Sequence, residues 1–368
     1  SLTGGITASS KLPLGGLPGL NVEAGVDSEF SGKGGAAANN AGQLYLDGGI
    51  SDGPGGSGNH FIKAGLGSVF LTGTNTYTGT TTITGGLLAI NSNADLASSL
   101  QIVLAGGGLA AWENSFTMDR NISIQTTANN VVGWFDVQAG LTLTQSAGST
   151  IEGPQNAAFT NSGMLMKRGL GTMVLNGTNA MTGVVVLDGV LQVNHQAALG
   201  DPARVGVSDI QIGGDFLIGG ANNNTRYTGG TLRINDNVVT TRGIQFNNNG
   251  GSVYGGGIDV TAGNNFTVTG VMSQGTEFDY WFKTGAGTLV ATGVNTFRQA
   301  AFTNGTYQFS TNTPWANSTT TAADNTILEW IGGTLRAVNS GANISLTNQA
   351  STTTYNYGGG MTLQMESG

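Results

Sequence analysis

The stretch KAGLGSVFLTGTNTYTGTTTITGGLLAINSNADLASS, residues 63–99, decides how the rest of the chain is interpreted. It returns from Lys167 as KRGLGTMVLNGTNAMTGVVVLDGVLQVNHQAALGDP and from Lys283 as KTGAGTLVATGVNTFRQAAFTNGTYQFSTNTPWANS. Each copy has a Lys-x-Gly-x-Gly start, an alternating strand, an asparagine and a second alternating strand. An internal repeat of this kind predicts one structure built from stacked units, in which each unit buries its apolar face against the next.

The repeating unit is longer than the quoted stretch. A strand beginning with Ala-Gly precedes each lysine start, at Ala41, Ala139 and Ala262, and a Gly-Gly-x-apolar turn follows each copy. These motifs predict a continuous solenoid over residues 41–368, with modules at approximately 41–138, 139–261 and 262–368. Residues 1–40 are irregular and glycine-rich, and we expect them to form a cap or an arm, because the end of a solenoid exposes strand edges that need covering.

Composition and turn spacing favour an all-β fold. The 368 residues include 63 glycines, only 9% are charged, and 38% are hydrophobic. Thr, Val, Ile and Phe favour strands, whereas Gly and Asn supply turns. Strands of four to six residues are each followed by a turn signal, and no ten-residue segment has helical periodicity. The pattern predicts a parallel β-solenoid rather than an array of sandwich domains, since no composition shift or linker separates one module from the next.

Charge and cysteine content exclude several classes of partner. The net charge is −8 and no run of Lys or Arg occurs, so we expect no nucleic acid partner. No apolar stretch of about 18 residues occurs, so we expect no membrane insertion in this segment. The chain has no cysteine and therefore no disulfide to stabilise it.

Because it starts without Met and ends in mid-pattern, we expect it to be a fragment or processed product of a longer protein.

Several motifs are similar to the autotransporter-associated β-strand repeat. They are Lys-Thr-Gly-Ala-Gly-Thr-Leu at 283–289, the run from Leu71 to Gly79, and Gly-Gly-Leu-Leu at 85–88. The resemblance covers about residues 41–368 and implies a right-handed parallel β-helix. It also implies an extracellular location on the outer surface of a Gram-negative-type bacterium. The third copy departs from the pattern, because Phe297-Arg298-Gln299 stands where the first copy has Tyr-Thr-Gly, so that turn is expected to differ.

Catalytic chemistry has little support in the sequence. The two histidines, His60 and His195, lie in non-equivalent places, and neither Gly-x-Ser-x-Gly nor His-Glu-x-x-His occurs. A polysaccharide-active enzyme on a β-helix would need paired carboxylates on neighbouring coils. The candidate pairs are Asp47 with Asp52 and Asp119 with Asp136. Acids scattered along a solenoid also come close by chance, so we expect no enzyme and no catalytic residue.

We also expect no cofactor. Calcium is the alternative, because Gly213-Gly214-Asp215-Phe216 and the run from Gly48 to Gly53 resemble Gly/Asp calcium repeats. Such repeats need an Asp on every coil, and here the Asp does not recur.

Two sets of residues stand out as contacts or as corners of the coils. Aromatic residues that could contact a ligand or partner are Tyr280, Trp281, Trp112 and Trp330, although large aromatic side chains are more often buried. Residues predicted to form structural corners are Asn75, Asn179, Asn295, Gly67, Gly171 and Gly287. The asparagines are expected to satisfy backbone groups of the turns.

The sequence therefore predicts a structural and adhesive segment of a large secreted bacterial surface protein. Its expected partners are neighbouring copies of itself in a fibre or biofilm, or a host or matrix glycan or protein. Two alternatives stay open. One is a repeating subunit of an extracellular filament, and the other is a polysaccharide-active β-helix enzyme.

Overall fold

The computed structural model describes residues 43–52, 58–99, 101–125, 132–153, 162–200, 210–213, 229–246, 256–274, 281–293, 295–297, 299–310 and 326–338. It also describes five short segments, 6–8, 12–13, 20–21, 353–357 and 362–366. These residues form 35 strands and one 3-10 helix, η1 (Asn93–Leu96). The chain divides into two compact units, one of Ser1–Val184 with Ala197–Val207 and one of Val185–Gln196 with Ser208–Gly368.

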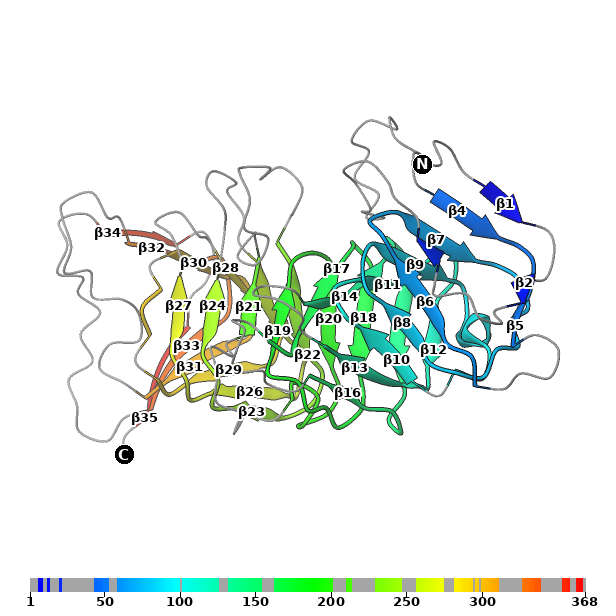
Figure 1. Cartoon of the computed structure of the whole chain (residues 1–368). Helices are drawn as coiled ribbons and strands as arrows, with labels where there is room; N and C mark the ends of the chain where they lie inside the picture. The colour runs from blue at the N-terminus through cyan, green and yellow to red at the C-terminus, as the bar shows by residue number, and fades with distance from the viewer. Residues whose placement is uncertain are drawn as a thin grey trace. The chain divides into compact units, whose positions relative to one another are not determined.

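The first unit consists of short strands that pair with strands one coil away (Figure 1). They are β1 (Ile6–Ala8), β2 (Leu12–Pro13), β3 (Leu20–Asn21), β4 (Gln43–Leu46), β5 (Ile50–Ser51), β6 (Phe61–Ala64), β7 (Ser68–Leu71), β8 (Thr81–Ile83), β9 (Leu87–Ile90), β10 (Gln101–Leu104), β11 (Gly108–Ala111), β12 (Phe116–Met118), β13 (Asn121–Ile124), β14 (Gly133–Val137), β15 (Thr142–Gln145), β16 (Ile151–Glu152), β17 (Met164–Arg168) and β18 (Thr172–Leu175).

Three main sheets form the walls of this unit. The first sheet runs β1-β4-β7-β9-β11-β14-β17, the second runs β3-β6-β8-β10-β13-β16, and the third contains β12-β15-β18. The strand pairs are parallel, as in β7 with β9 and β10 with β13. Parallel neighbours separated by a full turn of chain define a parallel β-helix, and the predicted right-handed β-solenoid is confirmed.

The second unit repeats the same construction. Strand β19 (Gly183–Val186) leads into β20 (Val190–Val193), β21 (Ile210–Ile212), β22 (Thr231–Ile234), β23 (Val238–Thr240), β24 (Ile244–Phe246), β25 (Gly257–Val260), β26 (Asn265–Val268), β27 (Met272–Gln274), β28 (Trp281–Thr284), β29 (Thr288–Ala291), β30 (Gln299–Phe302), β31 (Thr306–Phe309), β32 (Thr326–Trp330), β33 (Thr334–Val338), β34 (Thr353–Tyr357) and β35 (Thr362–Glu366). Its sheets run β21-β24-β27, β20-β22-β25-β28-β30-β32-β34 and β23-β26-β29-β31-β33-β35.

Columns of apolar side chains fill the inside of the coils. In the first sheet Leu44, Val69, Leu88, Leu109 and Phe135 occupy one register position on successive strands, and all are buried. Side chains on a strand alternate between its two faces, so a column at one register position points to one side of the sheet. Burial of these columns is the main apolar contribution to stability.

The coils have two forms. Val69 pairs with Leu88, and the short coil between them holds β7 and β8. Leu109 pairs with Phe135, and the longer coil between them holds β11, β12 and β13. The repeats seen in the sequence use the short form. In the first unit the copy from Lys63 begins on β6 of the second sheet and the copy from Lys167 on β17 of the first sheet, so these copies do not lie in one column.

Residues 1–40 were predicted to form a cap or arm. Only three short strands of this segment are described, and they pair in parallel with β4, β5 and β6 as a further coil would. The rest of the segment lies outside the described residues.

The glycines of the Lys-x-Gly-x-Gly start have two different roles. Gly65, Gly169 and Gly285, two residues after each lysine, have φ angles of 75°, 75° and 71°, a region that favours glycine. Gly171 and Gly287, four residues after the lysine, are required because of close packing. A Cβ at Gly171 would overlap the carbonyl oxygen of Gln138, and a Cβ at Gly287 would overlap that of Thr261.

Substitution of Gly171 by Ala tests the close packing between coils. We expect the Gly171→Ala protein to lose about 2 kcal/mol of free energy of unfolding, because the backbone of the neighbouring coil must shift. Gly148→Ala is the matched control, since a Cβ at Gly148 meets nothing within 4 Å. Denaturant unfolding measures both. Equal stability of the two variants would contradict the steric argument.

Candidate functional site

Each repeat buries the lysine with which it starts. Lys63 lies on β6 with no exposed surface, and its ammonium donates to the carbonyl oxygens of Ala64 (2.9 Å), Gly65 (2.8 Å) and Gly85 (2.8 Å). The first two carbonyls belong to its own turn, and the third belongs to the turn one coil later. An ammonium has three N–H donors, so three carbonyls satisfy it. The side chain therefore connects two successive coils.

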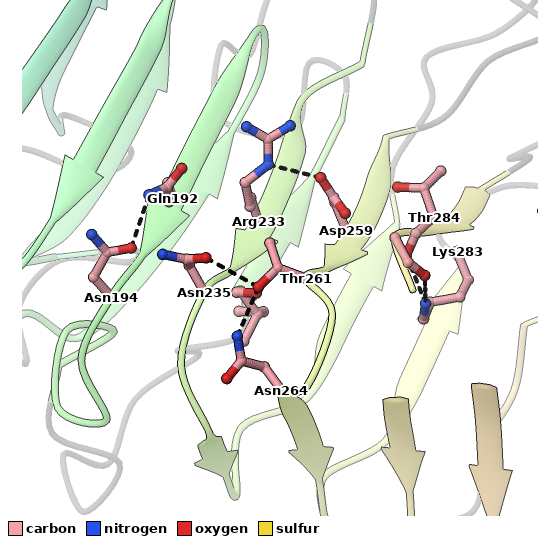
Figure 2. Close-up of polar contacts among 11 residues, drawn as sticks. Gln192, Asn194, Arg233, Asn235, Asp259, Thr261, Asn264, Lys283 and Thr284 are labelled. Atoms are coloured by element: carbon pink, nitrogen blue, oxygen red, sulfur yellow. Dashed lines mark hydrogen bonds and ion pairs between the residues drawn. The ribbon is translucent and has the colours of Figure 1, made fainter. Parts of the chain in front are cut away.

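Bonds from the ammonium to the carbonyls of its own turn recur at the other two lysines. Lys283 on β28 donates to the carbonyls of Thr284 (2.6 Å), Gly285 (2.9 Å) and Asn304 (3.2 Å), the last again one coil later. Figure 2 shows Lys283 with Thr284. Lys167 on β17 donates to the carbonyls of Arg168 (2.7 Å) and Gly169 (2.6 Å). Both lysines are fully buried.

Burial lowers the pKa of Lys63 to about 8 and that of Lys283 to about 8. Removal of the ammonium from water disfavours its charged form. At Lys283 the charge of Asp259 acts in the opposite direction. Asp259 in turn forms an ion pair with Arg233, with Oδ2 and Nε 2.7 Å apart (Figure 2). Both lysines keep their proton at neutral pH but are near the point of losing it in mild alkali.

The predicted asparagine corners lie between coils. Asn75 Oδ1 accepts from the backbone N–H of Ile50 at 2.8 Å, and its Nδ2 donates to the carbonyl of Asp95 at 2.5 Å. The first partner lies on the coil before and the second on the coil after. Asn75 is buried, so its amide satisfies backbone groups that water does not reach.

The other two asparagines also accept one hydrogen bond and donate another, with different partners. Asn179 Oδ1 accepts from the backbone N–H of Ile151 at 2.9 Å, and its Nδ2 donates to the carbonyl of Ala198 at 2.8 Å. Asn295 Oδ1 accepts from the N–H of Met272 at 3.2 Å, and its Nδ2 donates to the hydroxyl of Tyr307 at 3.2 Å. Gly67, also predicted as a corner, is buried, and its carbonyl oxygen accepts from the N–H of Leu87 at 3.2 Å.

Three of the four acids considered for catalysis accept hydrogen bonds outside the strands, and the fourth lies on a strand. Asp52 accepts from the Thr78 hydroxyl at 2.6 Å and from the N–H groups of Thr78 and Asn59, and the Thr78 hydroxyl bond is the main cause of its lowered pKa. Asp47 accepts from the hydroxyl of Thr72 at 2.6 Å, and Asp119 accepts from the side chain of Asn93. Asp136 is buried at a register position paired with Arg168.

The two histidines lie in different surroundings, and the described residues hold no metal-binding group. His60 Nδ1 accepts from the N–H of Thr80 at 3.0 Å in a turn, and His195 follows β20. The described residues hold no group of three or more His, Asp or Glu that could bind a metal ion. Asp215, one of the residues considered for calcium, lies outside the described residues.

The aromatic residues singled out as contacts separate into different environments. Trp281 is fully buried, stacked on Phe246 with ring centroids 4.5 Å apart and edge-on to Phe297 at 5.0 Å. This corrects the surface role considered for Trp281, because its ring has no accessible area. Tyr280 and the side chain of Trp330 lie outside the described residues. Trp112 is only partly buried, directly after β11.

Trp112 belongs to an aromatic cluster on the outward face of the first sheet. Tyr45 stacks on Phe70 with ring centroids 4.4 Å apart, and Trp112 packs edge-on to Phe70 at 4.7 Å and tilted against Tyr45 at 5.9 Å. We call Tyr45, Phe70 and Trp112 the outer aromatic cluster. Tyr45 and Phe70 occupy the positions next to Leu44 and Val69 on their strands, so they point away from the core column.

Small residues on neighbouring strands provide room for the rings. Ala89 and Ala110 take the register position of Phe70 on the next two strands and pack with the cluster. Gly108 lies under the ring of Trp134, where any Cβ would overlap the indole. The guanidinium of Arg168 lies 5.4 Å from the centroid of the Trp134 ring, in cation–π contact.

Sequence reasoning missed most of this cluster. Tyr45 and Phe70 were not singled out, and the lysines were interpreted as markers of the repeat rather than as buried hydrogen-bond donors. One signal was present. Val69-Phe70-Leu71 breaks the alternation of apolar and polar residues, and such a run is typical of a strand buried on both faces.

Coils held together by buried lysines and asparagines define a β-helix built from repeats. Three stretches of this chain, residues 61–90, 165–193 and 282–307, match the family model of the passenger-associated-transport-repeat. The chain thus carries the repeats of autotransporter passenger regions, and the resemblance noted in the sequence is confirmed. Each match begins just before one of the three buried lysines.

One relative shares a longer region. The Adhesin BmaC autotransporter of Brucella suis biovar 1 (strain 1330) is 29% identical over 249 residues, which is 64% of this chain and 6% of that protein. The chain therefore spans only a small part of the relative that it matches. No solved structure matches the chain. The described residues contain no helix long and apolar enough to cross a membrane.

The buried lysines predict how stability changes with pH. Unfolded lysine holds its proton up to its ordinary pKa of 10.5, whereas folded Lys63 and Lys283 release theirs near 8. Between these values the unfolded state binds more protons, so the free energy of unfolding rises with pH, by at most about 1.4 kcal/mol per pH unit for each lysine. Above about pH 10 the trend reverses, because burial raises the pKa of Tyr77 to about 12 and the unfolded tyrosine ionises first.

Denaturant unfolding between pH 7.5 and 11 measures this profile. The Lys63→Met and Lys283→Met proteins serve as paired variants. In each, the free energy of unfolding should rise less between pH 8 and 10 than in the parent protein, because one buried lysine is absent. A parent protein whose stability falls steadily from pH 8 would contradict the burial of charged lysines. So would variants that keep the full slope.

Proposed function

We propose that this chain is a structural and adhesive segment of a passenger displayed on the surface of a Gram-negative-type bacterium. The single observation that carries the proposal is the set of three passenger-associated-transport repeats, each built around a buried lysine. The relative from Brucella suis is named as an adhesin, which supports the adhesive part of the proposal. This chain covers 6% of that protein, so the adhesive role is proposed for this chain and is not taken over from the relative.

The structural role follows from how one coil holds the next. Backbone hydrogen bonds run between parallel strands of successive coils, and the buried lysines and asparagines add bonds between their turns. Stability of such an array is a sum of nearest-neighbour terms, so coils can be added without a new fold. We infer that the segment acts as a rod that holds adhesive surfaces away from the cell.

The fate of the acids supports a non-enzymatic role. Asp52, Asp47 and Asp119 each accept hydrogen bonds from side chains of the neighbouring turns. A general acid or base needs a carboxyl group free to exchange a proton with substrate. These three carboxylates instead hold neighbouring turns together through hydrogen bonds.

Surface display tests the adhesive role. We expect cells that carry this chain fused to an autotransporter translocator to adhere several-fold better to host-cell monolayers or to matrix-coated wells than cells with the translocator alone. As the control, antibody staining verifies that both strains display equal amounts of protein. Equal adherence of the two strains at equal display would contradict the proposal.

The rod is tested separately with purified protein. Sedimentation velocity and negative-stain electron microscopy should show an extended particle. A frictional ratio typical of a compact sphere would contradict the structural part and leave the adhesive part standing.

A further inference from the structure

We infer that the outer aromatic cluster, together with Glu113 and the amides beside it, is a binding site for a neutral glycan. This inference rests on the adhesive function proposed above and names the class of ligand that adhesion would use. The site lies in the first unit, at the end of strands β4, β7, β9, β11 and β14. It is independent of the buried lysines.

The aromatic part of the site is partly accessible and held in place. Tyr45 and Trp112 are half-buried, whereas Phe70 between them is fully buried. The stacked contact of Tyr45 with Phe70 and the edge contact of Trp112 with Phe70 fix both outer rings. Fixed aromatic rings bind with little loss of side-chain freedom, which favours affinity. The C–H faces of a hexose ring are apolar and suit such a surface.

A polar rim borders the rings. Glu113 follows Trp112 directly and is exposed, and its carboxylate accepts from Asn91 Nδ2 at 3.2 Å. Its backbone N–H donates to Gln138 Oε1 at 3.3 Å. On the other side, Gln43 Oε1 accepts from the hydroxyl of Tyr45 at 3.4 Å. Carboxylate, amide and phenol groups next to an aromatic surface are the donors and acceptors that sugar hydroxyls pair with.

The backbone of Glu113 is strained. Its φ angle is 67°, in the left-handed region that costs about 1 kcal/mol for a residue with a side chain. Glycine would adopt this turn without that cost, as it does at many other turns of the chain. The turn holds a carboxylate beside Trp112 and near Tyr45, and the charge of Glu113 contributes to the raised pKa of Tyr45, after burial. Strain at an exposed turn next to aromatic rings indicates a functional position.

Charge selects the kind of glycan. The carboxylates of Glu113 and Asp47 lie at the ends of the strands that carry the cluster, and the net charge of the chain is −8. Arg168 is buried and lies over Trp134. Acidic sugars would meet repulsion at this rim, whereas neutral sugars would not. A protein partner would need about 20–30 residues a side for a stable interface, far more than this cluster offers.

Titration calorimetry of the full chain tests the site. The ligands are neutral oligosaccharides of glucose, mannose, galactose and N-acetylglucosamine, with sialylated and uronic-acid oligosaccharides as the acidic arm. We expect at least one neutral series to bind and the acidic arm to bind at least tenfold more weakly. Trp112→Ala should weaken neutral binding at least tenfold, while Trp281→Phe, at the buried tryptophan of the second unit, should leave it unchanged.

Two substitutions of Glu113 separate a functional role from a structural one. Glu113→Gly should raise the thermal midpoint by about 2 °C, because the strain is relieved, yet weaken glycan binding several-fold. Glu113→Gln should weaken binding without raising the midpoint. No binding by any neutral series, equal binding by Trp112→Ala, or tighter binding of acidic sugars would overturn the inference. Adhesion of displayed cells that persists in Trp112→Ala would also overturn it, while leaving the proposed adhesive function in place.

Discussion

Every strand that the structure describes depends on the coil beside it for its backbone hydrogen bonds. A short strand has no partner within its own coil, and its N–H and C=O groups pair with parallel strands one coil before and one coil after. A buried backbone group without a partner costs free energy, so no coil is stable alone. The alternating sequence adds apolar columns on top of this ladder, as at Val69 and Leu88.

Turns between strands face the same requirement without the regular ladder, and the repeat meets it with side chains. The ammonium of Lys63 gathers carbonyls from two successive turns, and the amide of Asn75 bridges an N–H and a carbonyl on either side of its own coil. Lysine in this role has a cost, because removal of its charge from water lowers its pKa. Its three donors offset part of that cost. The Lys-x-Gly-x-Gly start is thus one unit, in which the first glycine makes the turn around the ammonium.

The sequence was sufficient for the fold class and insufficient for the arrangement of copies. Period-2 alternation, dense turn signals and the threefold repeat predict stacked parallel coils, and the structure confirms them. The two coil lengths could not be predicted, because both the short coil that begins at Val69 and the longer coil that begins at Leu109 consist of short strands and turns. For the same reason, nothing in the sequence showed that Lys63 and Lys167 begin on different sheets.

The candidate site was harder to predict than the fold, for a physical reason. Trp112 stood out by residue type alone, but its partners Tyr45 and Phe70 come from earlier coils of the chain, and only the register brings them together. The strained φ of Glu113 has no sequence signal either. Repeat positions bond to the coils on both sides, whereas Glu113, beyond the end of its strand, is exposed. Specific recognition in a repeat-built β-helix is therefore expected where the sequence departs from the repeat, as it does at Trp112 and Glu113.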